Sequence, residues 1–223
     1  GAMVKILSTL NSSHGLFDIL SERIEKSLEN YKMTIPGPVV VFGDASASMS
    51  VAIRTSGIIT SLLASISNAD LHLFRDKDQP IVDAPTSVKT AIQFGQEMRA
   101  HSSTSPAASL HPYVVGKIPV GTFIIVTDEE ENTGWNGSWT ERFPTGEYSF
   151  ASDYKKYVET VKPARLIFIS FSDPNSDQVM TSALKSVLGE KTYSELVDMY
   201  KFSPTNPDLN KMDLILERLS RTY

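Results

Sequence analysis

The chain has 223 residues, of which 41% are hydrophobic and 21% charged, and its formal net charge is −5 at pH 7. These values are typical of a globular domain, and no apolar run approaches the roughly 20 residues that span a bilayer. The absence of cysteine excludes disulfides, zinc–thiolate sites and cysteine nucleophiles, and the acidic balance argues against direct nucleic-acid binding, which depends on clustered lysine and arginine.

The predicted organisation is a single domain. Gly1 to Met3 resemble the remnant of a cleaved expression tag, so the native sequence is expected to begin near Val4. Residues 4–223 are expected to form one domain, because a single α/β core commonly takes this many residues. Within it, an N-terminal helix at about 16–32 precedes a core at about 39–221.

The first predicted elements are a helix, a strand and a second helix. Between residues 16 and 31, apolar side chains recur every three or four positions, which predicts a helix with one buried face. The four consecutive apolar residues at 39–42 are typical of a parallel strand that is buried on both faces. Residues 51–66 are apolar at helical spacing and contain no proline, so they predict a helix packed on the sheet.

The same alternation continues to the end of the chain. Strands are predicted at 70–74, 122–127 and 166–170, with a weaker candidate at 196–200, and helices at 88–98, 152–161, 178–188 and 208–219. Strands that alternate with helices predict an α/β fold with a mainly parallel central sheet and helices on both faces.

One long segment, 132–150, does not fit this alternation. It is rich in glycine, asparagine and aromatic residues, and loops of this length are usually functional or mobile. Its aromatic residues are expected either to fold back on the sheet edge or to contact a partner; they are Trp135, Trp139, Phe143, Tyr148 and Phe150.

Candidate functional residues follow two of the predicted strands. Ligands of open parallel sheets bind outside the carboxyl ends of the strands, where Asp44, Ser46 and Ser48 follow the first strand and Asp128 follows a later one. Mg²⁺ prefers six oxygen ligands, and the alternation of Asp44, Ser46 and Ser48 allows three side-chain oxygens to face one point. Because serine hydroxyls are neutral, such an ion would keep residual charge and an open position for a carboxylate from a partner.

This pattern resembles the metal ion-dependent adhesion site of von Willebrand factor A (vWA) domains, and the resemblance covers about Val39 to Leu219. It implies a Rossmann-like fold and nominates Thr104, in the segment 102–110, as a further ligand. The implied metal residues are therefore Asp44, Ser46, Ser48, Thr104 and Asp128. Within the family, the chain is most similar to the intracellular branch related to the carboxyl-terminal domain of Ro (TROVE) RNA-binding proteins.

The resemblance implies a non-enzymatic domain that binds a protein partner, through an acidic side chain of that partner. The implied cofactor is Mg²⁺, with Mn²⁺ or Ca²⁺ as alternatives. Neither direct nucleic-acid binding nor membrane attachment is expected of this domain. A cytoplasmic location is expected, with an extracellular one left open.

The sequence departs from the family pattern at three places. Gly43 replaces the apolar residue before the first aspartate, which predicts an unusual turn there. Ser102 and Ser103 replace a flexible glycine pair before Thr104 and put the reach of that ligand in question. The acidic run 129–131 stands where a glycine is common; it is expected to be a solvated loop, although its charge could also fill the open metal position or repel an acidic ligand.

Several other interpretations remain open at this stage. Asp44, Ser46 and Ser48 could instead cap the helix that follows, which would leave a structural interaction domain of a ribonucleoprotein or larger assembly with an empty or non-essential metal site. A phosphatase-like hydrolase is less favoured, since that chemistry needs a second carboxylate at position 46, which is serine. Among the histidines, His72 is expected in the core, whereas His14, His101 and His111 are interpreted as isolated loop residues without a ligand partner.

Overall fold

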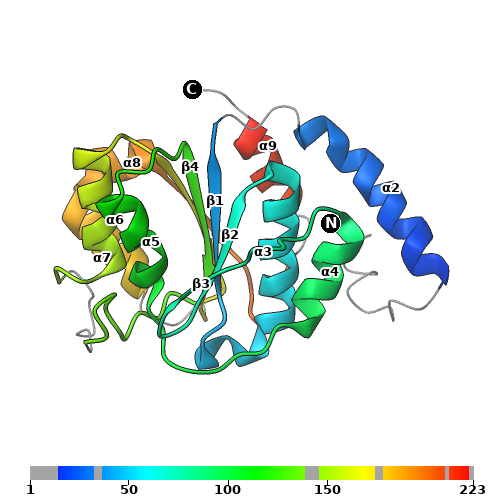
Figure 1. Cartoon of the computed structure of the whole chain (residues 1–223), viewed down its shortest axis with the longest axis horizontal. Helices are drawn as coiled ribbons and strands as arrows, with labels where there is room; N and C mark the ends of the chain where they lie inside the picture. The colour runs from blue at the N-terminus through cyan, green and yellow to red at the C-terminus, as the bar shows by residue number, and fades with distance from the viewer. Residues whose placement is uncertain (1–14, 33–36, 139–145, 174–177, 209–210, 221–223) are drawn as a thin grey trace.

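The computed structural model describes residues 15–32, 37–138, 146–173, 178–208 and 211–220. Over these residues the chain forms a six-stranded sheet in the order β3-β2-β1-β4-β5-β6, with helices on both of its faces (Figure 1). None of the helices in these ranges has the length and hydropathy needed to cross a membrane.

The central strands are parallel and buried. β1 (Val39–Asp44) lies between β2 (Asp70–Phe74) and β4 (Thr122–Thr127), and β5 (Arg165–Ser170) and β6 (Val197–Lys201) follow in parallel. Every residue of β1 and of β4 is buried, as their continuous apolar sequences predict for strands covered on both faces. The only antiparallel pairing among the described strands joins β2 to the short edge strand β3 (Asp78–Pro80).

Two apolar cores lie on opposite faces of the sheet because successive side chains of a strand point to opposite sides. In β1, Val39 and Val41 belong to one core, and Val40 and Phe42 belong to the other. Both cores contain fully buried isoleucine, phenylalanine or leucine side chains, each of which contributes roughly 1.5–3 kcal/mol through removal from water.

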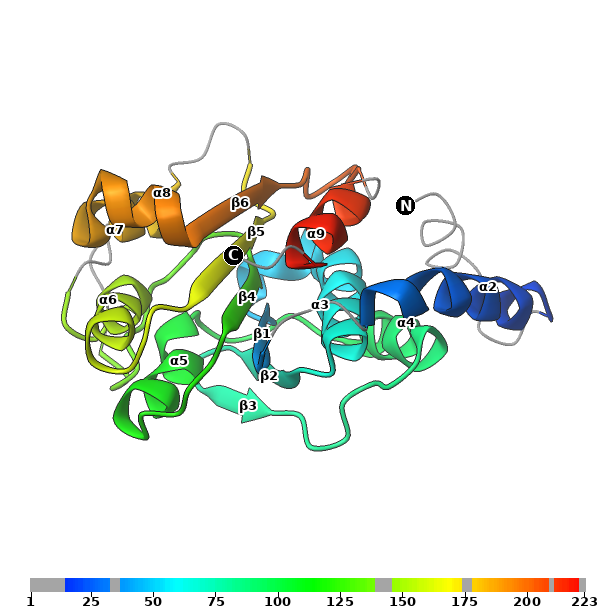
Figure 2. The same ribbon diagram turned by 90° about the horizontal axis from the view of Figure 1, so that it is seen from above.

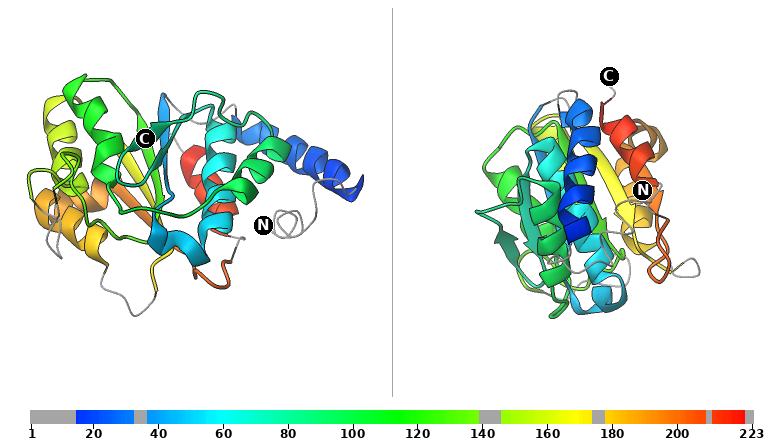
Figure 3. Two further views of the ribbon diagram at one scale, coloured as in Figure 1. Left: turned by 60° about the horizontal axis from the view of Figure 1, so that its bottom comes forward. Right: turned by 90° about the vertical axis from the view of Figure 1, so that its right-hand side faces the viewer.

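The helices divide between these two faces, as Figures 1 and 2 show. The first layer consists of α3 (Ile53–Ser67), α4 (Val88–Glu97), α9 (Lys211–Ser220) and α2 (Gly15–Lys32). The second layer contains α5 (Pro106–Val115), α6 (Phe150–Thr160) and α7 (Val179–Leu188). The short helix α8 (Glu190–Leu196) contacts α7 and β6. Helix α2 contacts α3, α4 and α9 and lies on the outside of its layer (Figure 3).

Most predicted elements are confirmed, with ends shifted by a few residues; a short 3₁₀ helix (Ala47–Val51), two α-helices and one strand were missed. The edge strand β3 has only three residues and ends in proline, so it offers no alternating pattern. Helix α5 contains Pro112, which the sequence analysis did not associate with a helix. Helix α8 has no buried residue and therefore no apolar periodicity.

Candidate metal site

Asp44 lies at the carboxyl end of β1, directly beside the end of β4. The register places Gly43 opposite Val126, so that Asp44 and Thr127 are neighbours. The Thr127 hydroxyl donates to Asp44 Oδ2 at 2.6 Å, and the Ser46 amide donates to Asp44 Oδ1 at 2.9 Å. These bonds fix the orientation of the carboxylate, and a hydrogen bond from the Ser46 side chain also lowers its pKa.

The serine hydroxyls connect the first loop to Asp128. The Oγ atoms of Ser46 and Ser48 lie 3.1 Å apart, and the Ser48 hydroxyl is close enough to the carboxylates of Asp128 and Glu130 to lower the pKa of each, against the effect of burial. Ser46 is buried and Ser48 is exposed, so this chain of oxygens runs from the interior to the surface. The structure therefore brings Asp44, Ser46, Ser48 and Asp128 together at one edge of the sheet.

Thr104 lies in a third loop, which is hydrogen-bonded to the loop after β1 and to the loop after β4. Its amide donates to Asn132 Oδ1 at 2.9 Å, and its carbonyl accepts from the amides of Asn132 and Thr133. The amide of Ala47 donates to the carbonyl of Ser102 at 3.1 Å. Thr104 is buried, but within the described part of the chain no hydrogen bond links its hydroxyl to the other four predicted metal residues.

The electrostatics of the site favour a cation. Burial, with the nearby negative charge of Asp128, raises the pKa of Asp44 to about 7. Burial likewise raises the pKa of Asp128, against the opposing effect of its hydrogen bond from Ser48. Two neighbouring carboxylates that resist ionisation are stabilised when a positive ion comes between them.

The donor atoms fit Mg²⁺, which prefers carboxylate, hydroxyl and water oxygens. The residues suited to hold it are Asp44, Ser46, Ser48, Thr104 and Asp128, with two carboxylates supplying the charge. Over the ranges that the structure describes, no group of three or more histidine, cysteine or acidic side chains could hold a metal ion, so a site here depends on its hydroxyls. Magnesium binding stays a prediction.

The helix-capping alternative accounts for part of this geometry. A 3₁₀ helix, η1 (Ala47–Val51), begins after the capping position Ser46, whose side chain makes no capping hydrogen bond. Asp44 does accept the Ser46 amide, and Asp128 Oδ1 accepts the Glu130 amide at 3.2 Å. The aspartates therefore order backbone amides, whereas the two serine hydroxyls point to other side-chain oxygens.

Two expectations about backbone and charge were wrong. Gly43 makes no unusual turn; it lies inside β1, where a Cβ atom would come within 2.6 Å of Thr60 Cγ2 and 2.9 Å of Leu73 Cδ2. The acidic run is not fully solvated, because the side chains of Glu129 and Glu131 are buried and only Glu130 is exposed. Left-handed backbone instead occurs at Ser102 (φ +69°) and Glu129 (φ +71°), at or near the positions where the family pattern has glycine.

Glu129 is a structural residue that sequence reasoning missed. Its Oε1 accepts from the hydroxyls of Ser170 (2.6 Å) and Ser172 (3.2 Å), and its Oε2 accepts from the hydroxyl (2.6 Å) and the amide (3.3 Å) of Thr181. It thereby joins the loop that carries Asp128 to β5 and to the start of α7. No sequence pattern distinguishes this glutamate from its neighbours, because its partners lie 41 to 52 positions away.

The loop after residue 131 packs against the second helical layer. Glu131 Oε1 accepts the Phe150 amide at 2.8 Å, and burial raises the pKa of Glu131 to about 8. The Trp135 ring stacks on His111 at 3.7 Å between centroids and meets Tyr148 edge-on at 5.1 Å. These aromatic residues and the buried Phe150 therefore pack within the domain, whereas Trp139 and Phe143 lie outside the described residues.

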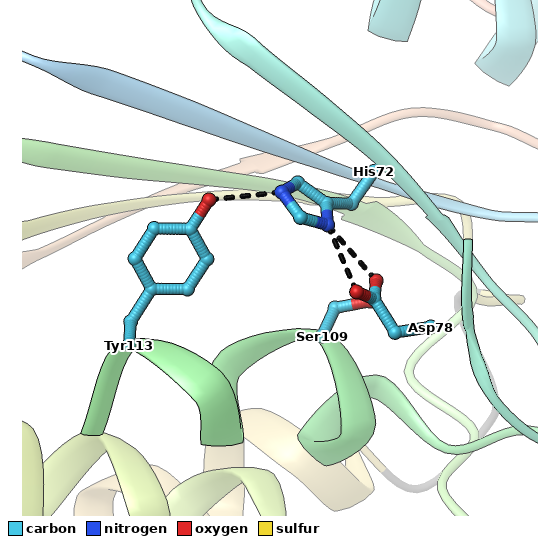
Figure 4. A network of polar contacts seen from close by, with 4 residues as sticks. All are labelled: His72, Asp78, Ser109 and Tyr113. Atoms are coloured by element: carbon cyan, nitrogen blue, oxygen red, sulfur yellow. Dashed lines mark hydrogen bonds and ion pairs between the residues drawn. The ribbon is translucent and has the colours of Figure 1, made fainter. Parts of the chain in front are cut away.

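His72 takes part in a network of polar contacts. His72 Nε2 lies 2.8 Å from the Tyr113 hydroxyl and its Nδ1 lies 3.0 Å from Asp78, which also accepts from Ser109 (Figure 4). Ser109 thus bonds to the carboxylate and not to the imidazole, and the network joins α5 to β2 and β3.

The expectation of isolated loop histidines was wrong for His111. This residue lies in α5, and its Nδ1 is 2.9 Å from Asp153 Oδ2. His101 Nδ1 is 3.1 Å from the Ser102 hydroxyl in an exposed loop. His14 lies outside the described residues.

Comparisons with known proteins bear on the fold. No protein-family model and no curated sequence matches the chain. Among solved structures it is similar to the Ro (RSR) protein of Deinococcus radiodurans, with 15% identity, a TM-score of 0.56, and coverage of 92% of this chain and 38% of that one. It is also similar to the conserved hypothetical protein BatB of Bacteroides thetaiotaomicron, with 10% identity, a TM-score of 0.51, and coverage of 83% and 98%.

A von Willebrand factor type A protein from Catenulispora acidiphila aligns more loosely, with 10% identity, a TM-score of 0.46, and coverage of 82% of this chain and 41% of that one. The chain thus spans 38% of the Ro protein and nearly all of BatB. At these identities the likeness concerns the fold and not the site. The chain has a Rossmann-like α/β fold, with a mainly parallel sheet between two helical layers, and shares its overall fold with the Ro protein and BatB.

Proposed function

We propose that this domain is a non-enzymatic protein-binding module that holds Mg²⁺ in a metal ion-dependent adhesion site and engages a partner through that ion. One observation carries the proposal: Asp44 and Asp128, from two adjacent strand ends, are joined through the hydroxyls of Ser46 and Ser48 and have raised pKa values. The cytoplasmic location expected from the resemblance belongs to the same proposal.

The chemistry follows from the charge of the donors. Two carboxylates balance the charge of Mg²⁺, while the neutral hydroxyls of Ser46, Ser48 and Thr104 add ligands without adding charge. If these five side chains filled five of the six positions around Mg²⁺, the sixth would hold water or an outside carboxylate, so the open position and not residual charge would attract the partner. The bound ion therefore supplies an electrophilic position at the surface, and Asp44 and Asp128 hold it there.

A structural interaction domain without a functional metal is the second candidate. It is favoured by the hydrogen bonds that already engage Asp44 and by the interior hydrogen bonds of Glu129. In that case the same carboxylates would serve to order the three loops.

A pull-down with the whole chain as bait separates these two candidates. We expect wild type to retain a partner from lysate in Mg²⁺ and to lose it in excess chelator, whereas Asp44→Ala loses it in both conditions. The exposed Asp83 gives the matched control, Asp83→Ala, which should behave as wild type. A partner retained equally by all three proteins in chelator would contradict the metal-dependent proposal and support the structural one.

A further inference from the structure

A pocket of about 510 Å³ opens beside the candidate metal site. It is formed by η1, by the loop after β4, by the segment after β5 with the start of α7, and by residues 204 and 205 after β6. Asp128 and Ser48 belong both to this pocket and to the metal site. A group bound in the pocket therefore lies next to whatever the metal holds, and the volume is in the range of pockets that accept ligands.

The charged side chains that line the pocket, over the described residues, are all acidic. Asp128, Glu129, Glu130 and Asp173 contribute to its wall. Glu129 is buried, with its carboxylate held by hydroxyl groups, whereas Glu130 and Asp173 are exposed at the rim. Glu130 thus adds negative charge beyond the two carboxylates, Asp44 and Asp128, that one divalent ion would neutralise.

The rest of the wall is largely apolar. Val51 is 68% exposed, and Val179 and Pro204 are half-buried. Phe171 closes the wall from the interior side. A long side chain with an aliphatic stem and a charged end matches this combination, because the stem can cover the valines while the charge stays near the acidic rim.

This charge arrangement constrains the partner, and the constraint rests on the proposed function. A partner carboxylate on the metal would bring one more negative charge to a rim that already carries Glu130 and Asp173. We propose that the partner presents a lysine or arginine close to its metal-binding carboxylate, and that this cationic side chain occupies the pocket. The cation offsets the repulsion, so the rim selects against partners that offer an acidic residue alone.

The test uses short acetylated and amidated Gly/Ser peptides that carry one glutamate, one arginine, both, or neither. In the peptides with both, the two residues are placed one to four positions apart. With saturating Mg²⁺, calorimetry should show that the best peptide with both charges binds about two- to fivefold tighter than the glutamate-only peptide, which is the gain that one partly exposed ion pair allows. Glu130→Gln should abolish most of this advantage.

Glu159→Gln serves as the matched control, because Glu159 is exposed near the end of α6, at the opposite edge of the sheet. It should leave the advantage of the arginine intact. If no spacing gives an advantage, or if the double variant Glu130→Gln with Asp173→Asn keeps it, the cation pocket is wrong.

Failure of the metal proposal gives a different result. In that case the glutamate-only peptide would bind equally with Mg²⁺, with chelator and to Asp44→Ala. If the arginine-only peptide then binds wild type but not Glu130→Gln, the cation pocket is supported. The metal-dependent function is contradicted by the same set of results. Binding of neither peptide would contradict both.

Discussion

At the scale of single residues, Asp44 is the group on which the site depends. Its carboxylate is buried, is oriented by the Thr127 hydroxyl and the Ser46 amide, and has a pKa raised to about 7 by burial and by Asp128. An acid whose pKa is raised binds a proton at a pH where an exposed aspartate would be ionised. A metal ion must displace that proton, since carboxylate ligands bind in the ionised form.

The affinity for Mg²⁺ should therefore rise with pH. For one proton with a pKa near 7, binding is weakened below pH 7 and levels off above it, so the dissociation constant at pH 6 should be about tenfold larger than at pH 8. Isothermal titration at both values, in buffers of different ionisation enthalpy, would also reveal the released proton. An affinity independent of pH between 6 and 8 would mean that Asp44 is already ionised or is not a ligand.

Glu129 combines a buried carboxylate with a left-handed backbone, and two substitutions separate these contributions. Glu129→Ala removes the acceptor shared by Ser170, Ser172 and Thr181 and keeps the strained φ of +71°, so unfolding in urea should show a loss of about 2–4 kcal/mol. Glu129→Gly loses the same hydrogen bonds but relieves the backbone, and should be about 1 kcal/mol less destabilised than the alanine variant. Equal stability of the two variants would show that the backbone stores no strain there.

The residues of the candidate site were predicted to different extents. Asp44, Ser46, Ser48 and Asp128 could be identified because they follow buried strands whose carboxyl ends share one edge. Thr127 and Glu129 could not, because their roles depend on which loops meet above the sheet. Thr127 becomes recognisable only from the register of β1 with β4, and Glu129 only from contacts with β5 and α7.

At the scale of elements, apolar patterns predicted the strands and helices that bury a face. The failures have two causes: β3 and α8 bury little and therefore show no periodicity, and α5 is interrupted by Pro112. The apolar sequence pattern also did not predict that α3 and α4 pack closely against each other. It depends on Gly57 and Gly95, which bring the two helix backbones together.

Gly95→Ala should separate these two helices. A Cβ atom at Gly95 would come within 2.4 Å of the backbone nitrogen of Ile58, and a backbone atom inside a helix cannot rotate away. Overpacking of this kind costs about 1–3 kcal/mol, measurable as a lower urea midpoint. Gly146→Ala is the matched control, because nothing lies within 4 Å of its added Cβ, and a similar loss in both variants would rule out this explanation.

At the scale of the whole molecule, the alternation of strands and helices predicted the fold class, and the sheet order and two helical layers confirm it. The site is a property of this larger arrangement. The site requires β1 and β4 to be neighbours in the sheet. It also requires the loop at 101–105 to lie beside the loops that follow these strands, and the Ala47–Ser102 and Thr104–Asn132 hydrogen bonds hold it there. Residues as far apart in the sequence as Asp44 and Thr127, which are 83 positions apart, thus contribute to one site.

A calorimetric titration of the whole chain with Mg²⁺ and Mn²⁺ tests this arrangement most directly, with the thermal midpoint followed in parallel. The account predicts saturable heat and a raised midpoint for wild type and for Asp83→Ala, and neither for Asp44→Ala. The absence of both heat and a midpoint shift in wild type, with either ion, would contradict it.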